Sequence, residues 1–179
     1  MRILQTKLKD SLIIEPKIFS DARGSFFESY NSEKYNALFK NEIFFYQDNI
    51  SVSKKNVLRG LHLQKKNPQG KLVSCVYGEV LDVAVDLRKN SESYLSWHAE
   101  ILSQDNLKQF WIPPGFAHGF YVLSDLAIFV YKCSERYFVD DEICIAWNDP
   151  TLSIDWNVDK APLLSEKDKK GLFIKDADF

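Results

Sequence analysis

The feature of the sequence that most constrains its fold is a series of short apolar segments separated by turn residues. The clearest segment covers residues 79–88, where two sets of residues alternate with a period of two. One set is Val80, Asp82, Ala84 and Asp86, and the other is Leu81, Val83, Val85 and Leu87. Because this period is that of a β-strand, we predict a half-buried strand here.

Further strands are predicted at residues 12–18, 24–30, 44–52, 58–64, 71–77, 97–102, 110–112, 119–122, 127–133 and 143–147. Turn-forming residues separate them, notably at 21–24, 67–70, 89–91 and 113–115. Two short helices are predicted at residues 31–40 and 165–171; Ser165 caps the second and Gly171 ends it. Many short strands at close spacing favour an antiparallel sandwich or barrel, so the predicted fold is all-β with minor helices.

Composition excludes several classes of protein. The chain has 179 residues, 45% of them hydrophobic, and we expect residues 1–179 to form one domain. A net charge of −2 does not suggest nucleic acid or an anionic membrane as a partner. The longest apolar run, residues 126–131, is far shorter than the roughly 20 residues of a membrane helix, and the first residues lack a signal-peptide core. The cysteines, Cys75, Cys133 and Cys144, lie in strand-like surroundings, which predicts reduced core residues of a cytoplasmic protein.

Ionisable side chains recur within segments that otherwise resemble core strands. They are Arg59, His62, Lys71, His118 and Tyr131. Burying a charge in a strand costs several kcal/mol unless the charge is paired or faces a wet cavity, and the interior of a barrel supplies such a cavity. Each residue alone has an ordinary structural explanation, for instance a hydrogen-bonded histidine or a charge at a sheet edge. Their combination favours a polar pocket inside the fold.

Two details qualify this prediction. Arg59 and His62 are three residues apart, so a regular strand would place them on opposite faces. Gly60 between them permits a bulge that brings both side chains into one cavity. Asp168 is as well explained by capping a helix as by a role in the pocket.

The sequence offers no obvious metal or nucleotide motif. It has no Walker, dinucleotide-binding, zinc-protease or nucleophile-elbow signature. A cupin metal site usually requires a His-x-His pair with a glutamate, whereas His62 is followed by Leu63 and Gln64. Because Arg59 and Lys71 lie near in sequence and repel a cation, we expect a site without metal.

The order of these motifs along the chain resembles the dTDP-4-dehydrorhamnose 3,5-epimerase family. The motifs are DARGSFFE (21–28), QDNIS (47–51), VLRGLHLQ (57–64), PQGKLV (68–73), VAVDLR (83–88), PGFAHGF (114–120), YK (131–132), WNDP (147–150) and LSEKD (164–168). The resemblance covers nearly the whole chain. It implies a cupin-type jelly roll that forms a homodimer and acts on a dTDP-linked 4-keto-6-deoxy sugar without cofactor or metal.

The resemblance also implies a role for each matching residue. His62 would be the base, Tyr131 the proton donor, Asp168 the partner of His62, and Lys71 the residue facing the keto oxygen. Arg23 and Arg59 would hold the phosphates, and Tyr137 would stack on thymine. The rest of the binding shell would be Glu28, Gln47, Asn49, His118, Glu142 and Lys167. Arg23 and Glu28 are expected to act across the dimer.

Other functions remain open at this point. A 3-epimerase or a 3,4-ketoisomerase would use much the same cavity. A non-catalytic sugar-binding jelly roll would need Arg59 and Tyr137 but not the combination of His62, Asp168 and Tyr131. A metal-dependent cupin oxygenase would need a third ligand that the sequence does not supply.

Overall fold

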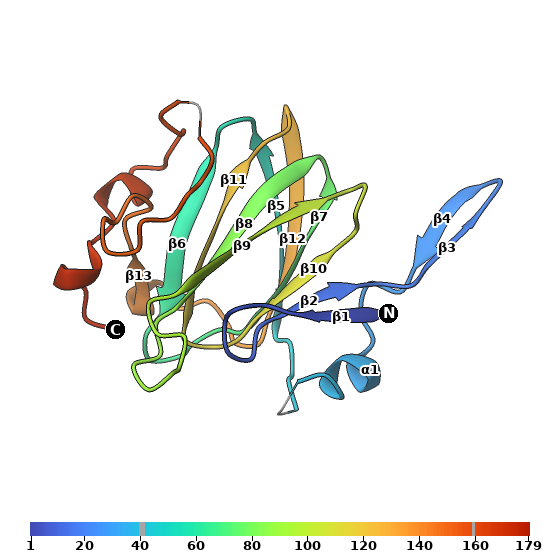
Figure 1. Cartoon of the computed structure of the whole chain (residues 1–179), viewed down its shortest axis with the longest axis horizontal. Coiled ribbons are helices and arrows are strands. Elements are labelled where there is room, and N and C mark those ends of the chain that lie inside the picture. The colour runs from blue at the N-terminus through green and yellow to red at the C-terminus, as the bar shows by residue number, and fades with distance from the viewer. Residues whose placement is uncertain (40–41, 159) are drawn as a thin grey trace.

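Two antiparallel sheets face each other in a computed structural model that describes residues 1–39, 42–158 and 160–179 (Figure 1). One sheet has the order β1 (Arg2–Gln5), β2 (Leu12–Glu15), β10 (Gln109–Ile112), β7 (Lys71–Tyr77), β12 (Leu126–Cys133), β5 (Gln47–Lys54). The other has the order β13 (Glu142–Cys144), β6 (Leu58–Gln64), β11 (Phe116–Val122), β8 (Glu79–Asp86), β9 (Trp97–Ser103). The all-β, cupin-type prediction is confirmed, and the sheets form an open sandwich.

A small hairpin projects from this body. It consists of β3 (Ile18–Asp21) and β4 (Gly24–Phe27), which extend to one side of the sandwich (Figure 1). The predicted strand at 12–18 is therefore divided: β2 ends at Glu15, and Pro16 follows. Proline cannot donate a ladder hydrogen bond, which explains the break. Strand β1 was not predicted from the sequence. β5 begins at Gln47, three residues after the predicted start at residue 44.

The helical segments are short. Helix α1 (Ser32–Asn36) begins after Asn31, whose side chain accepts a hydrogen bond from the Lys34 amide. It is shorter than the predicted helix at 31–40, of which residue 40 lies outside the described residues. The predicted helix at 165–171 contracts to a 3₁₀ turn, η2 (Asp168–Lys170), and further 3₁₀ turns are η1 (Val139–Asp141) and η3 (Ile174–Asp176). None of the helices in the described ranges is long and apolar enough to cross a bilayer.

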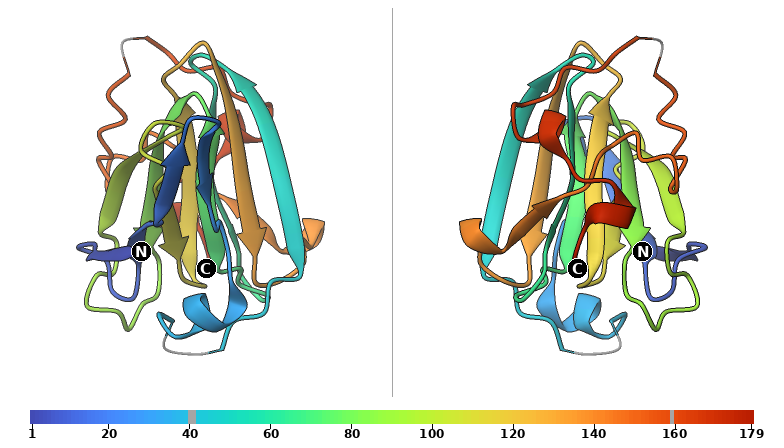
Figure 2. Two further views of the ribbon diagram at one scale, coloured as in Figure 1. Left: turned by 90° about the vertical axis from the view of Figure 1, so that its right-hand side faces the viewer. Right: turned by 90° about the vertical axis from the view of Figure 1, so that its left-hand side faces the viewer.

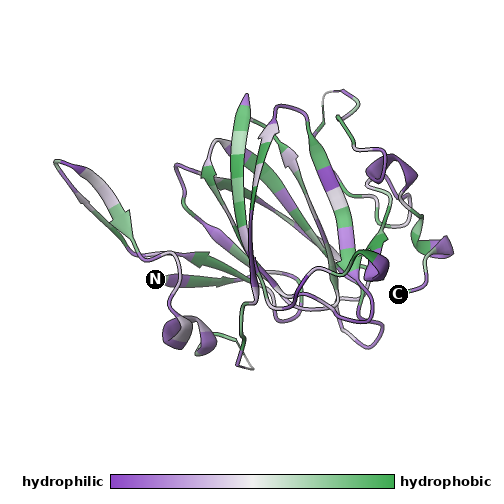
Figure 3. Cartoon of the chain, turned by 180° about the vertical axis from the view of Figure 1, so that it is seen from behind, coloured by the Kyte–Doolittle hydropathy of each residue, from purple (hydrophilic) through white to green (hydrophobic). Residues whose placement is uncertain are grey.

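Strand β8 is buried on both faces, so the prediction of a half-buried strand is wrong. Val80 and Ala84 pack into the core between the sheets, which includes Phe110 and Phe129. On the opposite face, Val83 and Val85 pack in a second core with residues such as Trp156. The C-terminal segment supplies that cover, and it lies outside the five-stranded sheet (Figures 2 and 3).

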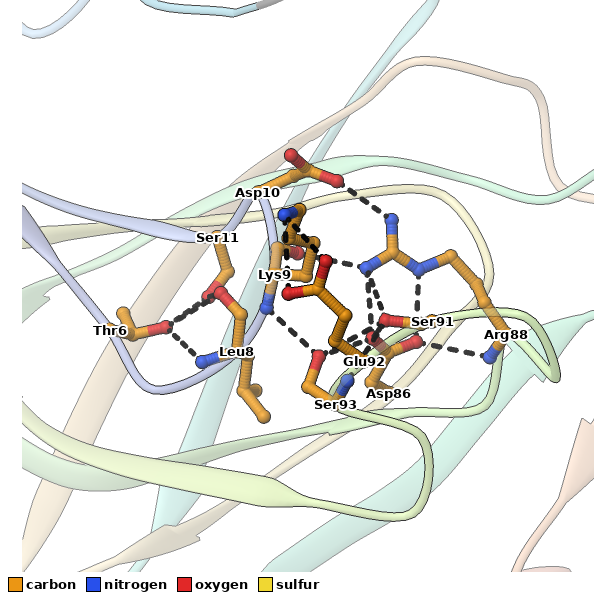
Figure 4. A network of polar contacts seen from close by, with 10 residues as sticks. All are labelled: Thr6, Leu8, Lys9, Asp10, Ser11, Asp86, Arg88, Ser91, Glu92 and Ser93. Carbon is orange, nitrogen blue, oxygen red and sulfur yellow. Dashed lines mark hydrogen bonds and ion pairs between the residues drawn. The ribbon is translucent and has the colours of Figure 1, made fainter.

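A network of polar contacts ties the β1–β2 turn to the loop between β8 and β9 (Figure 4). At its centre Asp86, fully buried, accepts hydrogen bonds from Arg88 Nε at 2.9 Å and from Ser93 Oγ at 2.6 Å, and another from Ser91. Arg88 also pairs with Asp10 at 3.2 Å. Burial opposes ionisation of Asp86, but the hydrogen bonds prevail and lower its pKa. The network holds these two loops together at the end of the sandwich where β8 ends.

Candidate active site

A polar pocket of about 600 Å³ opens between the two sheets. Strands β6 and β11 of one sheet and β5, β7 and β12 of the other supply its walls, and the C-terminal segment closes one side. It collects every residue proposed for the site from the sequence except Arg23 and Glu28. Those in the pocket are Gln47, Asn49, Arg59, His62, Lys71, His118, Tyr131, Tyr137, Glu142, Lys167 and Asp168.

The bulge expected at Gly60 is present and brings Arg59 and His62 to the same cavity. In the β6–β11 register His118 lies opposite His62, whereas Phe120 lies opposite Arg59, so β6 carries one extra residue between these pairs. Gly60 has a φ of +117°, and a Cβ there would lie 2.6 Å from the Cα of Gly119. Only glycine tolerates both the backbone conformation and this approach.

His62 and Asp168 form a close pair at the pocket wall. His62 Nε2 lies 2.6 Å from Oδ1 of Asp168, although the residues are 106 positions apart. Ser165 Oγ donates to Oδ2 of the same carboxylate at 2.7 Å. Burial disfavours the charge of Asp168, but the bonds from His62 and Ser165 outweigh it and lower the pKa of the carboxyl. An ionised Asp168 accepts a hydrogen bond from the Nε2–H of His62, which leaves the Nδ1 lone pair of His62 free to act as a base.

Two basic side chains of the pocket, Lys71 and His118, are almost fully buried. Burial lowers the pKa of Lys71, against the raising influence of Cys133, Glu142 and Asp82. Burial likewise lowers the pKa of His118, although its Nε2 lies 2.8 Å from Oδ2 of Asp82. Both groups are thus poised to gain stabilisation from negative charge that appears in the pocket.

Tyr131 enters the pocket from the sheet opposite His62. It lies on β12 and packs partly against the intersheet core, near Phe129. Burial raises the pKa of its hydroxyl, which keeps the hydroxyl protonated. A base on one wall and a protonated phenol on the other can address two faces of one bound molecule.

The mouth of the pocket carries a chain of polar contacts. Glu142 accepts a hydrogen bond from Lys167 Nζ at 2.6 Å and another from the Tyr137 hydroxyl at 3.1 Å. Gln47 accepts one from the Tyr137 amide at 2.9 Å. Arg59 Nε donates to Ser53 Oγ at 3.0 Å. Tyr137 remains 47% exposed, so it is accessible for stacking.

Arg23 and Glu28 lie away from this pocket within the chain. Arg23 is at the tip of the projecting hairpin and pairs with Asp21 at 2.5 Å. Glu28 follows β4 and pairs with Lys34 at 2.8 Å. Neither residue contacts the other members of the predicted site in one copy of the chain.

Among the site residues that were not predicted from the sequence, three stand beside predicted ones. Asp82 supports His118, Ser165 supports Asp168, and the Cys144 thiol lies 3.7 Å from Asp168 Oδ1. Cys144 is half-buried beside the pair, so its assignment to the core is wrong, whereas Cys75 and Cys133 are buried as expected. Asp82 could have been identified from the sequence, because its carboxylate lies within an apolar strand and a buried carboxylate requires a partner.

Ligand atoms from His62, Cys144 and Asp168 lie within 4.8 Å of one another, which is compact enough to hold a metal ion. A carboxylate, an imidazole and a thiol suit zinc better than magnesium. The sequence spacing does not reveal this cluster, because its members come from β6, β13 and the C-terminal segment.

Comparisons with known proteins agree with this geometry. The family model described as dTDP-4-dehydrorhamnose 3,5-epimerase matches residues 5–176. A dTDP-4-dehydrorhamnose 3,5-epimerase of Pseudomonas aeruginosa is 49% identical over 178 residues, which cover 99% of this chain and 98% of that protein.

Solved structures of similar proteins share the fold. A dTDP-6-deoxy-D-glucose-3,5-epimerase from Legionella pneumophila in complex with dTDP-4-keto-L-rhamnose superposes with a TM-score of 0.95 at 48% identity, covering 97% of this chain and 93% of that one. A 3'-monoepimerase from Streptomyces bikiniensis in complex with dTDP-quinovose gives 0.90 at 31% identity, covering 96% and 87%. The sequence motifs, the pocket and these matches lead to one conclusion: the chain belongs to the dTDP-4-dehydrorhamnose 3,5-epimerase family.

Proposed function

We propose that His62 and Tyr131 exchange protons on opposite faces of a 4-keto sugar bound between the two sheets. The reaction is the epimerisation of dTDP-4-dehydro-6-deoxy-D-glucose at carbons 3 and 5, which gives dTDP-4-dehydro-L-rhamnose in dTDP-rhamnose biosynthesis. The observation that carries the proposed roles is the placement of the His62–Asp168 pair on one wall of the pocket and Tyr131 on the other.

His62 begins the reaction. Hydrogens on carbons 3 and 5 are acidic because both carbons flank the 4-keto group. Histidine suits this role because its imidazole can both take up and return a proton. Asp168 fixes the tautomer of His62 through the 2.6 Å contact, and it stabilises the imidazolium that forms.

Removal of either proton leaves an enolate, whose charge falls on the 4-oxygen. Lys71 is the proposed donor to this oxygen, since it is buried in the pocket. A developing anion favours the protonated amine, and one positioned donor of this kind contributes about 3–4 kcal/mol to the transition state. Inversion then requires a proton from the other face, and Tyr131 is the residue proposed to deliver it.

The remaining pocket residues bind the substrate. Arg59 and, from a second copy, Arg23 are proposed to hold the phosphates, and the exposed ring of Tyr137 is proposed to stack on thymine. Gln47, Asn49, His118, Glu142 and Lys167 complete the polar shell. The chemistry needs no electron transfer, and the 4-keto group already acidifies the reacting carbons. We therefore propose a reaction without cofactor or metal.

A homodimer is proposed from the outer face of the six-stranded sheet. Ile50 and Val52 on β5 are 72% and 59% exposed, and they align with Val130 and Ile128 on β12. β5 is the last strand of its sheet, so its backbone edge is open. This edge and the apolar face both favour packing against a second copy of the chain. With a second copy at this face, the projecting hairpin would carry Arg23 toward the pocket of the neighbouring copy. Glu28, which follows the hairpin, would approach the same pocket.

The whole chain is proposed to act as one domain in the cytoplasm. Both cores support a single domain, because the C-terminal segment packs on the same sheet that forms the pocket wall. Cys75, Cys133 and Cys144 form no disulfide with one another, which fits this proposed compartment.

Incubation with the 4-keto sugar nucleotide in heavy water tests the function. Deuterium at both carbons 3 and 5, together with a product inverted at both, is expected by NMR. Inversion at carbon 3 alone would instead assign a 3-epimerase, the second candidate, which the likeness to the Streptomyces bikiniensis monoepimerase favours. Movement of the keto group to carbon 3 would assign a ketoisomerase, and binding without exchange would assign a sugar-binding protein.

A further inference from the structure

The thiol of Cys144 adjoins the proposed catalytic pair, yet the proposed reaction uses no thiol. In the β13–β6 register Cys144 lies directly opposite His62. Its Sγ lies 3.7 Å from Asp168 Oδ1, and that oxygen lies 2.6 Å from His62 Nε2. A sulfur, a ring nitrogen and a carboxylate oxygen therefore converge at the pocket wall.

We infer that His62, Cys144 and Asp168 form a binding site for a thiophilic divalent cation such as Zn²⁺, and that the bound cation inhibits the enzyme. The binding step rests on this geometry alone. The inhibition rests on the proposed function, because it requires His62 to be the base.

The distances suit a small tetrahedral ion. Zinc binds sulfur at about 2.3 Å and nitrogen or oxygen at about 2.0–2.2 Å, so its ligand atoms lie roughly 3.3–3.6 Å apart. The sulfur–oxygen separation of 3.7 Å is close to this range. All three ligand atoms lie within 4.8 Å of one another, so the sulfur–nitrogen pair must close by no more than about 1.2 Å. The His62–Asp168 pair must open by less than about 1 Å, and the His62 side chain, 22% exposed, can turn to allow it. The pocket leaves the fourth position to water.

The negative charges of the ligand groups offset the repulsion from Arg59 and Lys71, which line the same pocket. Asp168 supplies one negative charge, and the thiolate supplies a second when the cation replaces the thiol proton, which passes to solvent. Lys167 is engaged by Glu142 at 2.6 Å. Thiolate is a soft ligand, so the site selects a cation with high affinity for sulfur. Mg²⁺, which prefers six oxygen ligands, is excluded on the same ground.

Occupation of the site removes the base whichever ring nitrogen binds. If Nε2 coordinates, the imidazole proton moves to Nδ1, which lies 3.9 Å from Glu142 Oε1 and can be stabilised there. If Nδ1 coordinates, its lone pair is lost directly. In both cases His62 has no lone pair for the substrate proton, so exchange stops without any change in the rest of the pocket.

Titration of the intact enzyme with Cd²⁺, in the absence of substrate, tests the site. A cadmium–thiolate charge-transfer absorption that saturates at one ion per chain is expected, and Cys144→Ser should abolish it. Cys133→Ser is the matched control, since Cys133 is the other pocket thiol, and it should retain the absorption. An absorption that survives Cys144→Ser, or none at all, overturns the inference.

The second arm measures inhibition by Zn²⁺. The rate of the wild-type enzyme should fall with added Zn²⁺, recover with a chelator and remain unaffected by Mg²⁺. Cys144→Ser, compared with its own metal-free rate, should require at least ~10-fold more Zn²⁺ because a ligand is gone. Cadmium binding without loss of turnover refutes the inhibitory part of the inference and counts against His62 as the base. Normal epimerisation with no cadmium absorption refutes the site and leaves the proposed function intact.

Discussion

The two buried aspartates of β8 have opposite surroundings, although both are fully buried and lie four residues apart on one face of the strand. Asp86 is satisfied by Arg88, Ser91 and Ser93, all of them within seven residues along the chain. Asp82 contacts His118 on the neighbouring strand, and its Oδ1 has no hydrogen-bond donor among the described residues.

The hydrogen-bond partners of the two aspartates distinguish a structural region from the proposed functional one better than cavity size does. A cavity of about 700 Å³ borders the Asp86 network. It is slightly larger than the pocket of about 600 Å³ near Asp82. Around Asp86 the polar groups neutralise one another and hold two loops together (Figure 4). Around Asp82 the polar groups come from both sheets and retain unused bonding capacity, which is what a substrate requires.

Loss of the proposed base, His62, should give the largest effect on exchange and should leave stability nearly unchanged. His62→Asn is expected to slow deuterium exchange at carbons 3 and 5 by about 10²–10⁴-fold. The free energy of unfolding should change by less than about 1 kcal/mol, because the side chain borders an open pocket. Exchange is read by NMR and stability by urea unfolding. A variant that unfolds readily would instead place His62 with the structural region.

Breaking the Asp86 network should have the converse result. Arg88→Met leaves the carboxylate of Asp86 buried without its cation, so the free energy of unfolding should fall by about 3 kcal/mol in a urea titration. Turnover per folded molecule should match the wild type. Arg88→Lys keeps a charge but loses the two-pronged contact, and its loss should be smaller. A drop in turnover without loss of stability would contradict the division between the two regions.

Ser165 sharpens the comparison within the functional region. Its hydroxyl donates to Asp168 and contributes to the lowered pKa of that carboxyl, so Ser165→Ala should raise this pKa. The acid limb of the pH profile of kcat/KM should therefore move to higher pH, with about a 10-fold loss of rate. Ser165→Thr retains the hydroxyl and should restore the wild-type profile. A uniform loss at every pH would indicate a purely structural role.

The smallest effect concerns acid stability. The pKa of Asp86 is lowered from its ordinary value of 3.8, so its ionisation stabilises the fold fully above that value. The contribution is lost as pH falls through the lowered folded pKa. Asp86→Asn should flatten the dependence of unfolding free energy on pH below about 4, as measured by urea titrations at several pH values. An unchanged slope would show that other carboxylates govern acid unfolding.

Features that depend on short-range residue patterns could be predicted from the sequence alone. Alternation predicted β8, and Gly60 predicted the bulge that joins Arg59 to His62. The cover over the outer face of β8 was not predictable, because the C-terminal segment that provides it is irregular and has no period. The Asp168–His62 contact spans 106 positions and was reached only through family resemblance. Cys144 was assigned to the core because of its strand-like surroundings, and spacing along the chain does not reveal that it lies opposite His62 on the neighbouring strand.

The placement of Arg23 and Glu28 shows another limit of one chain. Neither reaches the pocket in the copy described, and the hairpin that carries Arg23 is largely exposed, with Phe26 at 71%. In the proposed dimer their partners belong to a second copy, so one chain holds no contact that reveals these roles.

The most direct test of the account is the Tyr131→Phe variant incubated with the 4-keto sugar nucleotide in heavy water. The substitution keeps the ring that packs near Phe129 and removes the hydroxyl. With His62 and Lys71 intact, enolates should form, and NMR should find deuterium washed into the substrate with little inverted product. Inversion of both carbons at the wild-type rate would contradict the assignment of Tyr131 as the donor on the second face.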